Sequence, residues 1–597
     1  MNDHLPFAAG QSRTGGPSEL TATRRRSGGE ILVDTLRIHN TDTVFCLPGE
    51  SFLAAIDALA GAGDAVRTIV ARHEAGAAHM AEAYGKLTGQ PGICFVTRGP
   101  GASHAAIGVH TAAQDSTPMI LFIGQVARGM LGREAWQEVD FGQMFGGMAK
   151  WVVEIDRAER IPELVSRAFH VAVSGRPGPV VVSLPEDMLA EEVVVADARP
   201  YKRSAAHPGA DQLLHLGEMI GAAERPLVIV GGGGWNTQAC TNLKTFVETF
   251  DLPVVAGFRR QDILDNRHLN YIGHAGLGPS QTLVRRIRSA DLVIALGGRL
   301  GETTTSGYTL FGVPRPSQTF VHVHADPNEL GRVYQADLAI NAGMPEFAAA
   351  VAQMKPTAGL QNGTAQRKAW IASARADFLA EQIPGAMPGP LDLGAVMLHL
   401  REVLPADAVI SNGAGNYAIW VHKFHRYGGF RTQLAPTSGS MGYGLPAAIT
   451  AKLVHPERTT VCFAGDGCFL MSANELATAA RYRLGVVALV VNNGMYGSIR
   501  MHQEKEYPGR VHATELENPD FAALARAFAG YGEVVERTEE FAPAFERATA
   551  FAERYSKPAV LELRIDPEAI TPSTTLTQLR RAAQAAADAA ADRRAEA

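Results

Sequence analysis

Cysteine is scarce in this chain of 597 residues, which contains only five. No two of them stand at CxxC spacing, so the sequence gives no sign of a disulfide framework or of a cysteine-based metal site. Scattered cysteines of this kind are typical of small buried side chains in a protein that stays in a reducing compartment. The five are Cys46, Cys94, Cys240, Cys462 and Cys468.

Long apolar runs and an excess of basic charge are lacking as well. The longest apolar stretches, such as Leu484–Val491, are far shorter than the ~20 residues of a membrane-spanning helix. The 55 basic and 61 acidic residues give a formal net charge of −6, without the positive field that binding to nucleic acid requires. Residues 1–27 lack the apolar core of a secretory signal and are predicted to be a disordered tail. We therefore expect a cytoplasmic protein with no membrane or nucleic-acid partner.

Short β-branched runs alternate with alanine-rich, helical stretches along most of the chain. Examples of the runs are Thr43–Cys46, Met119–Ile123 and Pro179–Leu184, and the alternation starts again near Pro226 and near Asp407. Apolar runs of this length, separated by helices, are typical of a parallel sheet that is covered on both faces. The pattern predicts an α/β fold with three doubly wound parallel-sheet domains.

Polar segments that contain glycine and proline separate the three predicted domains. These segments, residues 199–210 and 357–366, are predicted to be linkers. The last residues are rich in alanine, which favours either a frayed helix or a disordered end. The predicted ranges are 28–195 for the N-terminal domain, 208–355 for the central domain, 386–572 for the C-terminal domain and 573–597 for the alanine-rich tail.

The most informative motif is Gly465-Asp466-Gly467, followed 27 residues after the aspartate by Asn493. Gly-Asp-Gly and the pair Asn492-Asn493 each come directly after an apolar run. Both are therefore expected at the carboxyl ends of parallel strands, where ligands bind in open α/β sheets. Asp466 and Asn493 offer the oxygen ligands that Mg²⁺ prefers. The flanking glycines let the backbone approach a phosphate closely. A tight turn with a capping aspartate is the alternative explanation for Gly-Asp-Gly alone.

This spacing resembles the signature of the thiamine diphosphate (ThDP) enzymes. The resemblance implies that Asp466, Asn493 and the backbone carbonyl of Met495 hold Mg²⁺ against the diphosphate of the cofactor. It further implies a pyrimidine-binding N-terminal domain and a diphosphate-binding C-terminal domain. The cofactor-binding residues implied in the C-terminal domain are Gly415, Asn416, Tyr417, Gly439, Met441, Gly465, Asp466, Gly467 and Asn493.

Two residues carry the chemistry of the cofactor in this resemblance. Glu74 stands in Arg-His-Glu-Ala-Gly-Ala and resembles the glutamate that bonds the aminopyrimidine ring and favours its imino tautomer. A glutamate at this strand-to-helix junction could instead simply favour a helix N-terminus. Met441 matches the apolar residue that wedges between the two rings, with the carbonyl of Gly439 accepting from the amine. Met441 as a plain core residue is the alternative.

The chain is closest to the acetolactate synthase large-subunit branch of this family, over residues 28–572. Gln137 and Lys150 match a pocket glutamine and a channel lysine of that branch, although either could be an ordinary surface residue. His502 lies where the branch has a tryptophan that shapes the acceptor pocket, unless it is a solvated loop residue. With Glu74, these three are the candidate catalytic residues. The segments that carry the resemblance are Val44–Gly49, Thr97–Ala102, Gly124–Val126, Ala135–Glu138 and Gly175–Pro185.

The central domain carries a run of four glycines, Gly231–Gly234, directly after a predicted strand. This is a place for a nucleotide phosphate, although the run is not GxGxxG. Arg299 and Asp326 resemble two contact sites for FAD in the acetolactate synthases. Where those enzymes carry Gly-Asp, this chain reads Asn341-Ala342-Gly343. FAD, ADP and no nucleotide at all remain open.

The resemblance implies an enzyme that decarboxylates a 2-oxo acid and adds the product to a second carbonyl compound. A simple 2-oxo acid decarboxylase and a diketone-cleaving enzyme are the alternatives, because Glu50, Ser51 and Trp136 depart from the acetolactate synthase pattern. A non-catalytic ThDP-binding regulator is disfavoured because Glu74 is retained. In this family one subunit supplies the glutamate and its neighbour the metal ligands, so a homodimer or homotetramer is expected.

Overall fold

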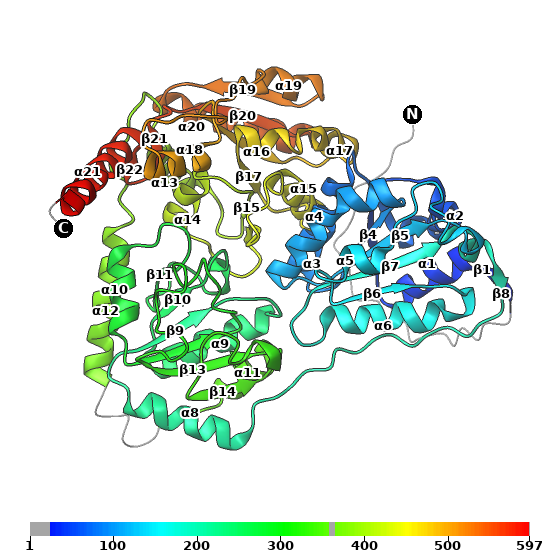
Figure 1. Ribbon diagram of the computed structural model, residues 1–597, viewed down its shortest axis with the longest axis horizontal. Coiled ribbons are helices and arrows are strands. Elements are labelled where there is room, and N and C mark those ends of the chain that lie inside the picture. Colours follow the sequence, from blue (N-terminus) through cyan, green and yellow to red (C-terminus); the bar gives the residue numbers. More distant parts are fainter. Residues whose placement is uncertain (1–23, 357–363, 596–597) are drawn as a thin grey trace.

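The computed structural model describes residues 24–356 and 364–595. Three parallel sheets of six strands each lie in three lobes of the molecule, with helices on both faces of each sheet (Figure 1). Continuous runs of valine, isoleucine and leucine form the inner strands, since such strands are buried on both sides. The predicted α/β fold with three parallel-sheet domains is confirmed.

The N-terminal sheet has the strand order β3-β2-β4-β5-β7-β6. Helices α3 and α4 cover one face of it, and α1, α2 and α6 cover the other. The first strand lies between the second and the third, so the chain reverses its winding direction between β2 and β4. The elements are β2 (Thr43–Cys46), β3 (Arg67–Val70), β4 (Gly92–Val96), β5 (Met119–Gln125), β6 (Trp151–Glu154), β7 (Pro179–Pro185), α1 (Gly28–Ile38), α2 (Leu53–Ala62), α3 (Glu74–Thr88), α4 (Gly99–Asp115), α5 (Phe141–Phe145), α6 (Ile161–Val173) and α7 (Glu186–Ala190).

The central sheet has the order β11-β10-β9-β12-β13-β14, which is the order of a dinucleotide-binding fold. Helix α12 follows the predicted end of this domain and packs on it, with Arg375 donating to the carbonyls of Asn266 and Tyr271. The elements are β9 (Pro226–Val230), β10 (Val254–Ala256), β11 (Tyr271–His274), β12 (Leu292–Leu296), β13 (Thr319–His324), β14 (Leu338–Asn341), α8 (Ala210–Ala222), α9 (Thr237–Thr249), α10 (Gln281–Ser289), α11 (Met344–Val351) and α12 (Thr364–Ala380).

The C-terminal sheet has the order β16-β15-β17-β18-β20-β19, which repeats the topology of the N-terminal sheet. Its winding reverses between β15 and β17. The elements are β15 (Val409–Asn412), β16 (Gln433–Leu434), β17 (Thr460–Gly465), β18 (Val487–Asn492), β19 (Tyr531–Val535), β20 (Ala559–Arg564), α13 (Leu393–Val403), α14 (Tyr417–Phe424), α15 (Gly444–Val454), α16 (Asp466–Leu470), α17 (Leu476–Arg481), α18 (Gly497–Glu506), α19 (Phe521–Ala527) and α20 (Thr538–Tyr555).

The N-terminal and C-terminal domains share one hydrophobic core, although they are far apart in the sequence. Helix α3 of the first domain packs against α15 of the third (Figure 1), and one cluster of buried residues runs through both. Buried polar contacts join the same helices, since the hydroxyl of Tyr443 donates to Glu82 over 2.6 Å. This packing fixes the first domain relative to the third within one chain.

The structure describes most of the C-terminal end of the chain but not the first 23 residues. Residues 1–23 of the predicted N-terminal tail lie outside the described residues, and Arg26–Ser27 (β1) pairs with Glu192–Val193 (β8). The alanine-rich end forms helix α21 (Leu576–Ala595), preceded by two short strands, β21 (Ala569–Thr571) and β22 (Thr574–Thr575). Of the second predicted linker, residues 357–363 are likewise outside the description. Within the described parts of the chain, no helix is both long and apolar enough to cross a membrane.

Candidate functional site

A cavity of about 260 Å³ lies at the carboxyl ends of the strands of the C-terminal sheet. The loops after β15, β17 and β18 form its polar side, next to the point where the winding of the sheet reverses. Ligands bind at this point in open parallel sheets, because the loops diverge there and leave a crevice. The lining includes every residue of this domain that was predicted to contact the cofactor or metal: Gly415, Asn416, Tyr417, Gly439, Met441, Gly465, Asp466, Gly467, Asn493 and Met495.

Asp466 is held in one orientation by three hydrogen bonds. Its Oδ1 accepts from the backbone N–H of Gly467 over 2.8 Å. Its Oδ2 accepts from the N–H of Gly494 over 2.9 Å and from Nδ2 of Asn518 over 2.8 Å. Burial raises the pKa of Asp466, and these donors work against that rise by favouring the ionised form. The carboxylate is therefore fixed and desolvated, as a metal ligand needs to be.

The two asparagines at the carboxyl end of β18 have different roles in the structure. Asn492 turns to the sheet, where its Nδ2 donates to Glu562 and its Oδ1 accepts from Asn518. Asn493 lines the cavity, and its Oδ1 accepts from the N–H of Met495 over 3.3 Å. A carboxylate, an amide and the Met495 peptide group thus border one side of the cavity, and their oxygens are the donor type that fits Mg²⁺.

Sequence reasoning did not identify Asn518. This residue lies in the loop before α19 and belongs to no motif, so no spacing could have indicated it. Its amide joins the loops after β17 and β18 by donating to both Asp466 and Asn492. Its own Oδ1 is buried and has no hydrogen-bond partner among the described residues. That unsatisfied oxygen is consistent with a further polar group in the site, because buried acceptors are rarely left unpaired.

The two glycines that flank Asp466 are required by close packing of tyrosine rings. A Cβ on Gly467 would lie 2.6 Å from the ring of Tyr496, and one on Gly465 would lie 3.1 Å from that of Tyr417. The sequence interpretation assigned these glycines to a close phosphate. The structure adds a second reason for them, since the rings that they admit form part of the cavity wall.

Met441 belongs to a turn that the N-terminal domain of the same chain braces. Gly439 adopts a left-handed backbone with φ of 71°, which glycine accepts at little cost. The hydroxyl of Ser440 bonds that of Thr111 on α4 over 2.8 Å, and the N–H of Thr437 donates to Asp115 over 2.6 Å. The turn that presents Met441 to the cavity is therefore held rigidly.

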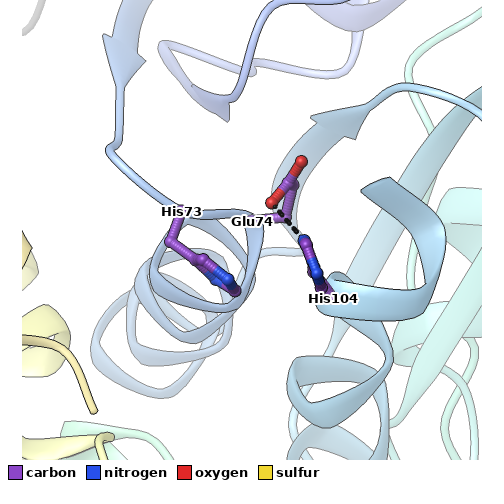
Figure 2. Close-up of side chains that lie close together, drawn as sticks. All are labelled: His73, Glu74 and His104. Atoms are coloured by element: carbon purple, nitrogen blue, oxygen red, sulfur yellow. Dashed lines mark hydrogen bonds and ion pairs between the residues drawn. The ribbon is translucent and has the colours of Figure 1, made fainter. Parts of the chain in front are cut away.

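Glu74 is the first residue of α3 and is nearly buried, with 7% of its surface exposed. Its Oε2 lies 2.9 Å from Nδ1 of His104 on α4 (Figure 2). His73 caps the helix by accepting from the N–H of Ala75. Glu74 does not line the cavity of the C-terminal domain in the part of the chain that the structure describes. One chain therefore presents the glutamate and the cavity that Asp466 lines in two separate places.

Of the three remaining candidate residues, Gln137 and His502 lie in different surroundings. Gln137 has a left-handed backbone with φ of 64°, its carbonyl accepts from the N–H of Gly99 at the start of α4, and its Oε1 is buried and unpaired among the described residues. His502 is exposed on α18, one turn beyond Ser498 and Ile499, which line the cavity. Residues three and four apart share a helix face, so His502 lies on the face that Ser498 and Ile499 share.

Lys150 is turned to the end of another helix. Its Nζ donates to the carbonyls of Val171 and Ser174, at the C-terminal end of α6, over 2.5 and 2.6 Å. Loss of hydration around the ammonium lowers the pKa of Lys150 to about 8, although the residue as a whole is exposed. The structure does not bring Lys150 to the cavity wall formed by the described residues, and its assignment to a substrate channel stays a prediction.

A second cavity, of about 390 Å³, lies where the winding of the central sheet reverses, between the loops after β9 and β12. Gly231, Gly232 and Arg299 line it, whereas Asp326 does not. Part of the glycine run is explained by packing, because a Cβ on Gly232 would lie 1.8 Å from the carbonyl oxygen of Gly297. The described residues of the N-terminal and C-terminal domains complete the wall, so the cavity lies among all three domains.

The three sheets and the oxygen-rich cavity define an α/β enzyme that binds a ligand at the carboxyl ends of its strands. Models of the thiamine pyrophosphate enzymes match in sequence order: the N-terminal TPP binding domain over residues 26–144, the central domain over 213–351 and the C-terminal TPP binding domain over 413–563. The chain belongs to this family and is a thiamine pyrophosphate-dependent enzyme. Thiamine pyrophosphate is another name for ThDP, so the predicted family is confirmed.

Several acetolactate synthases are similar to the chain over most of its length. The large subunit from Parasynechococcus marenigrum is 33% identical over 86% of this chain and 84% of its own. The large subunit from Corynebacterium glutamicum is 31% identical over 92% and 88%. The isozyme 2 large subunit from Escherichia coli is 30% identical over 87% and 93%.

Proposed function

We propose that the protein is a Mg²⁺-dependent enzyme that decarboxylates a 2-oxo acid and joins the product to a second carbonyl compound. The observation that carries the proposal is the set of oxygen groups at one cavity. The Asp466 carboxylate, the Asn493 amide and the Met495 backbone line it together, in the order that the motif predicts. Similarity to acetolactate synthases supports carbon–carbon bond formation as the outcome.

Each group of the chain has a defined task in this proposal. Asp466, Asn493 and the carbonyl of Met495 would hold Mg²⁺, and the loops around them would hold the diphosphate. Bound ThDP would supply the sink for the electron pair that a 2-oxo acid releases with CO₂. Glu74 would hold and move a proton at its carboxyl group. Met441 and Ile499 would exclude water from the reacting atoms, because both are apolar and line the cavity.

The acceptor substrate is proposed to meet Gln137 and His502. The positive φ and the unpaired Oε1 of Gln137 support this role, because strained backbone and unsatisfied polar atoms concentrate at functional sites. His502 shares the helix face of two cavity-lining residues, which supports its place at the mouth of the site. A polar imidazole there would favour a polar or acidic acceptor.

A complete site is proposed to need two copies of the chain. Glu74 lies on the N-terminal domain, whereas the described lining of the metal-binding cavity belongs to the C-terminal domain. The internal packing of α3 on α15 holds these two parts fixed in one chain. A second copy that brings its own Glu74 to the cavity would complete the site, which makes a homodimer or homotetramer the proposed assembly.

The central cavity is proposed to hold an adenine nucleotide or FAD. The support is its place at the reversal point of a sheet with the dinucleotide-binding strand order, together with Arg299 in its wall. The visible absorbance spectrum of the purified protein, followed by chromatography of the nucleotide that denaturation releases, distinguishes FAD from ADP. The five cysteines are free and four are buried, which supports the cytoplasm as the proposed compartment.

The activity is tested by measuring CO₂ release from a panel of 2-oxo acids, each with and without an aldehyde or a second oxo acid. The proposal expects CO₂ release with a new carbon–carbon bond in the product. Release of the free aldehyde in the presence of every acceptor would instead indicate a simple decarboxylase. Cleavage of a diketone, supplied as a separate substrate, without release of CO₂ would indicate the third reaction class.

A further inference from the structure

The carboxylate of Glu74 is hydrogen-bonded to His104, a histidine that lies outside every motif described above. Nδ1 of His104 lies 2.9 Å from Oε2 of Glu74, and Figure 2 shows the imidazole pointing at the carboxylate from the neighbouring helix. The other carboxylate oxygen faces Gly101, where a Cβ would lie 3.5 Å away. Helix α4 thus holds the carboxylate by a hydrogen bond on one oxygen and leaves room beside the other.

The helices that carry this pair are packed closely enough to fix its geometry. A Cβ on Gly108 would lie 2.4 Å from the Cβ of Ala78, so α4 approaches α3 as closely as only glycine permits. The rings of His73 and His104 lie against each other at a tilt of 31° with centroids 4.5 Å apart, which restricts the imidazole of His104 further. His73 already uses its Nδ1 as a helix cap, so it is His104 that approaches the carboxylate.

An imidazole at this distance can pair with both states of the glutamate. When the carboxylate is ionised, Nδ1–H of His104 donates to it, and when Glu74 holds a proton, a bare Nδ1 accepts from it. His104 can therefore keep the orientation of Glu74 while the proton on Glu74 comes and goes. A free glutamate would lose this orientation, because an unrestrained glutamate side chain populates several rotamers.

We propose that His104 is the positioning residue of Glu74: it holds the carboxyl group in place for proton exchange with the aminopyrimidine ring. This rests on the proposed function, in which Glu74 serves that ring. The imidazole is 53% exposed and the carboxylate only 9%, so His104 is replaceable without opening the core. Removing it should leave the fold and the cofactor site intact and slow the step that depends on Glu74.

The first test measures hydrogen–deuterium exchange of the thiazolium proton of ThDP bound to the holoenzyme. His104→Leu should slow the exchange by roughly 10-fold or more, since small misplacement of a catalytic group costs up to about 10²-fold. His104→Asn, whose Nδ2 stands where Nδ1 stands in histidine, should restore the rate to within about 3-fold. The affinity for ThDP should change little in either variant. His215→Leu, at an exposed histidine of α8, is the matched control.

Two outcomes overturn different claims. Exchange at the wild-type rate in His104→Leu, with slow exchange in Glu74→Gln, would refute the role of His104 and leave the proposed function standing. Wild-type exchange in Glu74→Gln would refute the part of the proposed function that assigns cofactor activation to Glu74, and the role of His104 with it.

A second test needs no cofactor. In thermal unfolding of the apoprotein, His104→Leu should lower Tm when Glu74 is intact. The same substitution should not lower Tm in the Glu74→Ala background. Equal effects in the two backgrounds would mean that the pair does not interact.

Discussion

Nδ2 of Asn518 donates to Oδ2 of Asp466 over 2.8 Å, across 52 residues of sequence. The same amide donates to Oδ1 of Asn492 over 3.0 Å, so one side chain connects the loops that follow β17 and β18. Both loops also meet through the N–H of Gly494, which donates to Asp466. The carboxylate proposed to bind Mg²⁺ is therefore oriented before any metal arrives, and its metal-binding role can be tested without disturbing the sheet.

Asp466→Ala should abolish the Mg²⁺-dependent binding of ThDP and leave the fold intact. The carboxylate is proposed to supply a metal oxygen, whereas the bonds that it accepts come from amides of α16 and of loops and not from the strands. Calorimetric titration with ThDP at saturating Mg²⁺ measures the loss. Asp520→Ala is the matched control: it removes the cap of α19, costs about 1 kcal/mol of stability and should leave the affinity unchanged. Unchanged ThDP affinity in Asp466→Ala would remove the argument from the motif.

Glu74→Gln should separate cofactor binding from proton transfer. Glutamine can still hydrogen-bond the aminopyrimidine ring, but it cannot exchange a proton with it. ThDP should bind, while exchange of the thiazolium proton slows by about 10²–10⁴-fold, the usual loss when an acid–base group is removed. Nuclear magnetic resonance after quenched-flow deuteration measures the rate. Glu218→Gln, at an exposed residue of α8, should exchange like the wild type; fast exchange in Glu74→Gln would point to a different activating group.

Mixed oligomers should regain activity from two inactive parents. If Glu74 and Asp466 of different copies meet in one site, co-expressed Glu74→Gln and Asp466→Ala chains form hybrids with one intact site. Random pairing into dimers makes half of the dimers hybrid, so about a quarter of the wild-type sites should be intact. The activity of the affinity-purified mixture measures this fraction. If both residues served the site of their own chain, no intact site could form and the mixture would stay inactive.

His502→Trp should shift the choice of acceptor towards small apolar compounds. The flat indole would replace a polar ring on the helix face that Ser498 and Ile499 share, adding contact with apolar groups and removing a hydrogen-bonding site. The ratio of kcat/KM for pyruvate to that for a polar oxo acid should rise by a factor equivalent to about 1–3 kcal/mol of transition-state binding. His512→Trp, at an exposed histidine nearby, is the control. Wild-type protein that already makes acetolactate efficiently, with no effect of His502→Trp, would place His502 outside the pocket.

The C-terminal helix should detach from α18 in acid or when Arg580 is removed. Arg580 of α21 donates to the fully buried Glu504. This bond makes the largest contribution, ahead of the N–H of Gly509 and the guanidinium of Arg500, to lowering the pKa of Glu504 from 4.5 to about 2. A carboxyl whose pKa is lower in the folded state stabilises it above the ordinary pKa and loses that effect as pH falls. The contribution, about 1.5–3 kcal/mol for charged hydrogen bonds, should be complete above pH 4.5 and vanish towards pH 2.

Hydrogen-exchange mass spectrometry of α21 measures this docking. Arg580→Ala should lose protection of the helix at neutral pH, and its difference from the wild type should shrink as pH falls through the window between 4.5 and about 2. The neighbouring Arg581→Ala, at an exposed position, should behave like the wild type. Equal protection in both variants would show that the ion pair does not hold the helix.

How far the sequence predicted the strands depended on where they lie in the sheets. Inner strands such as β5 and β7 are buried along their whole length, so their apolar runs were visible in the sequence. The edge strands β3, β6 and β19 are only partly buried and mix charged with apolar residues. Such strands carry no continuous apolar signal, and hydrogen bonding to an inner neighbour determines them instead.

The sequence by itself determined that Asp466 and Asn493 line one cavity, because residues that follow neighbouring parallel strands must meet at one edge of the sheet. It could not determine that Asn518 orients Asp466, that His104 contacts Glu74, or that Arg580 anchors the last helix to α18. Those contacts depend on how loops and helices from distant segments pack against one another. The sequence of a helix fixes which side chains share a face. Which neighbour that face contacts depends on how the core packs.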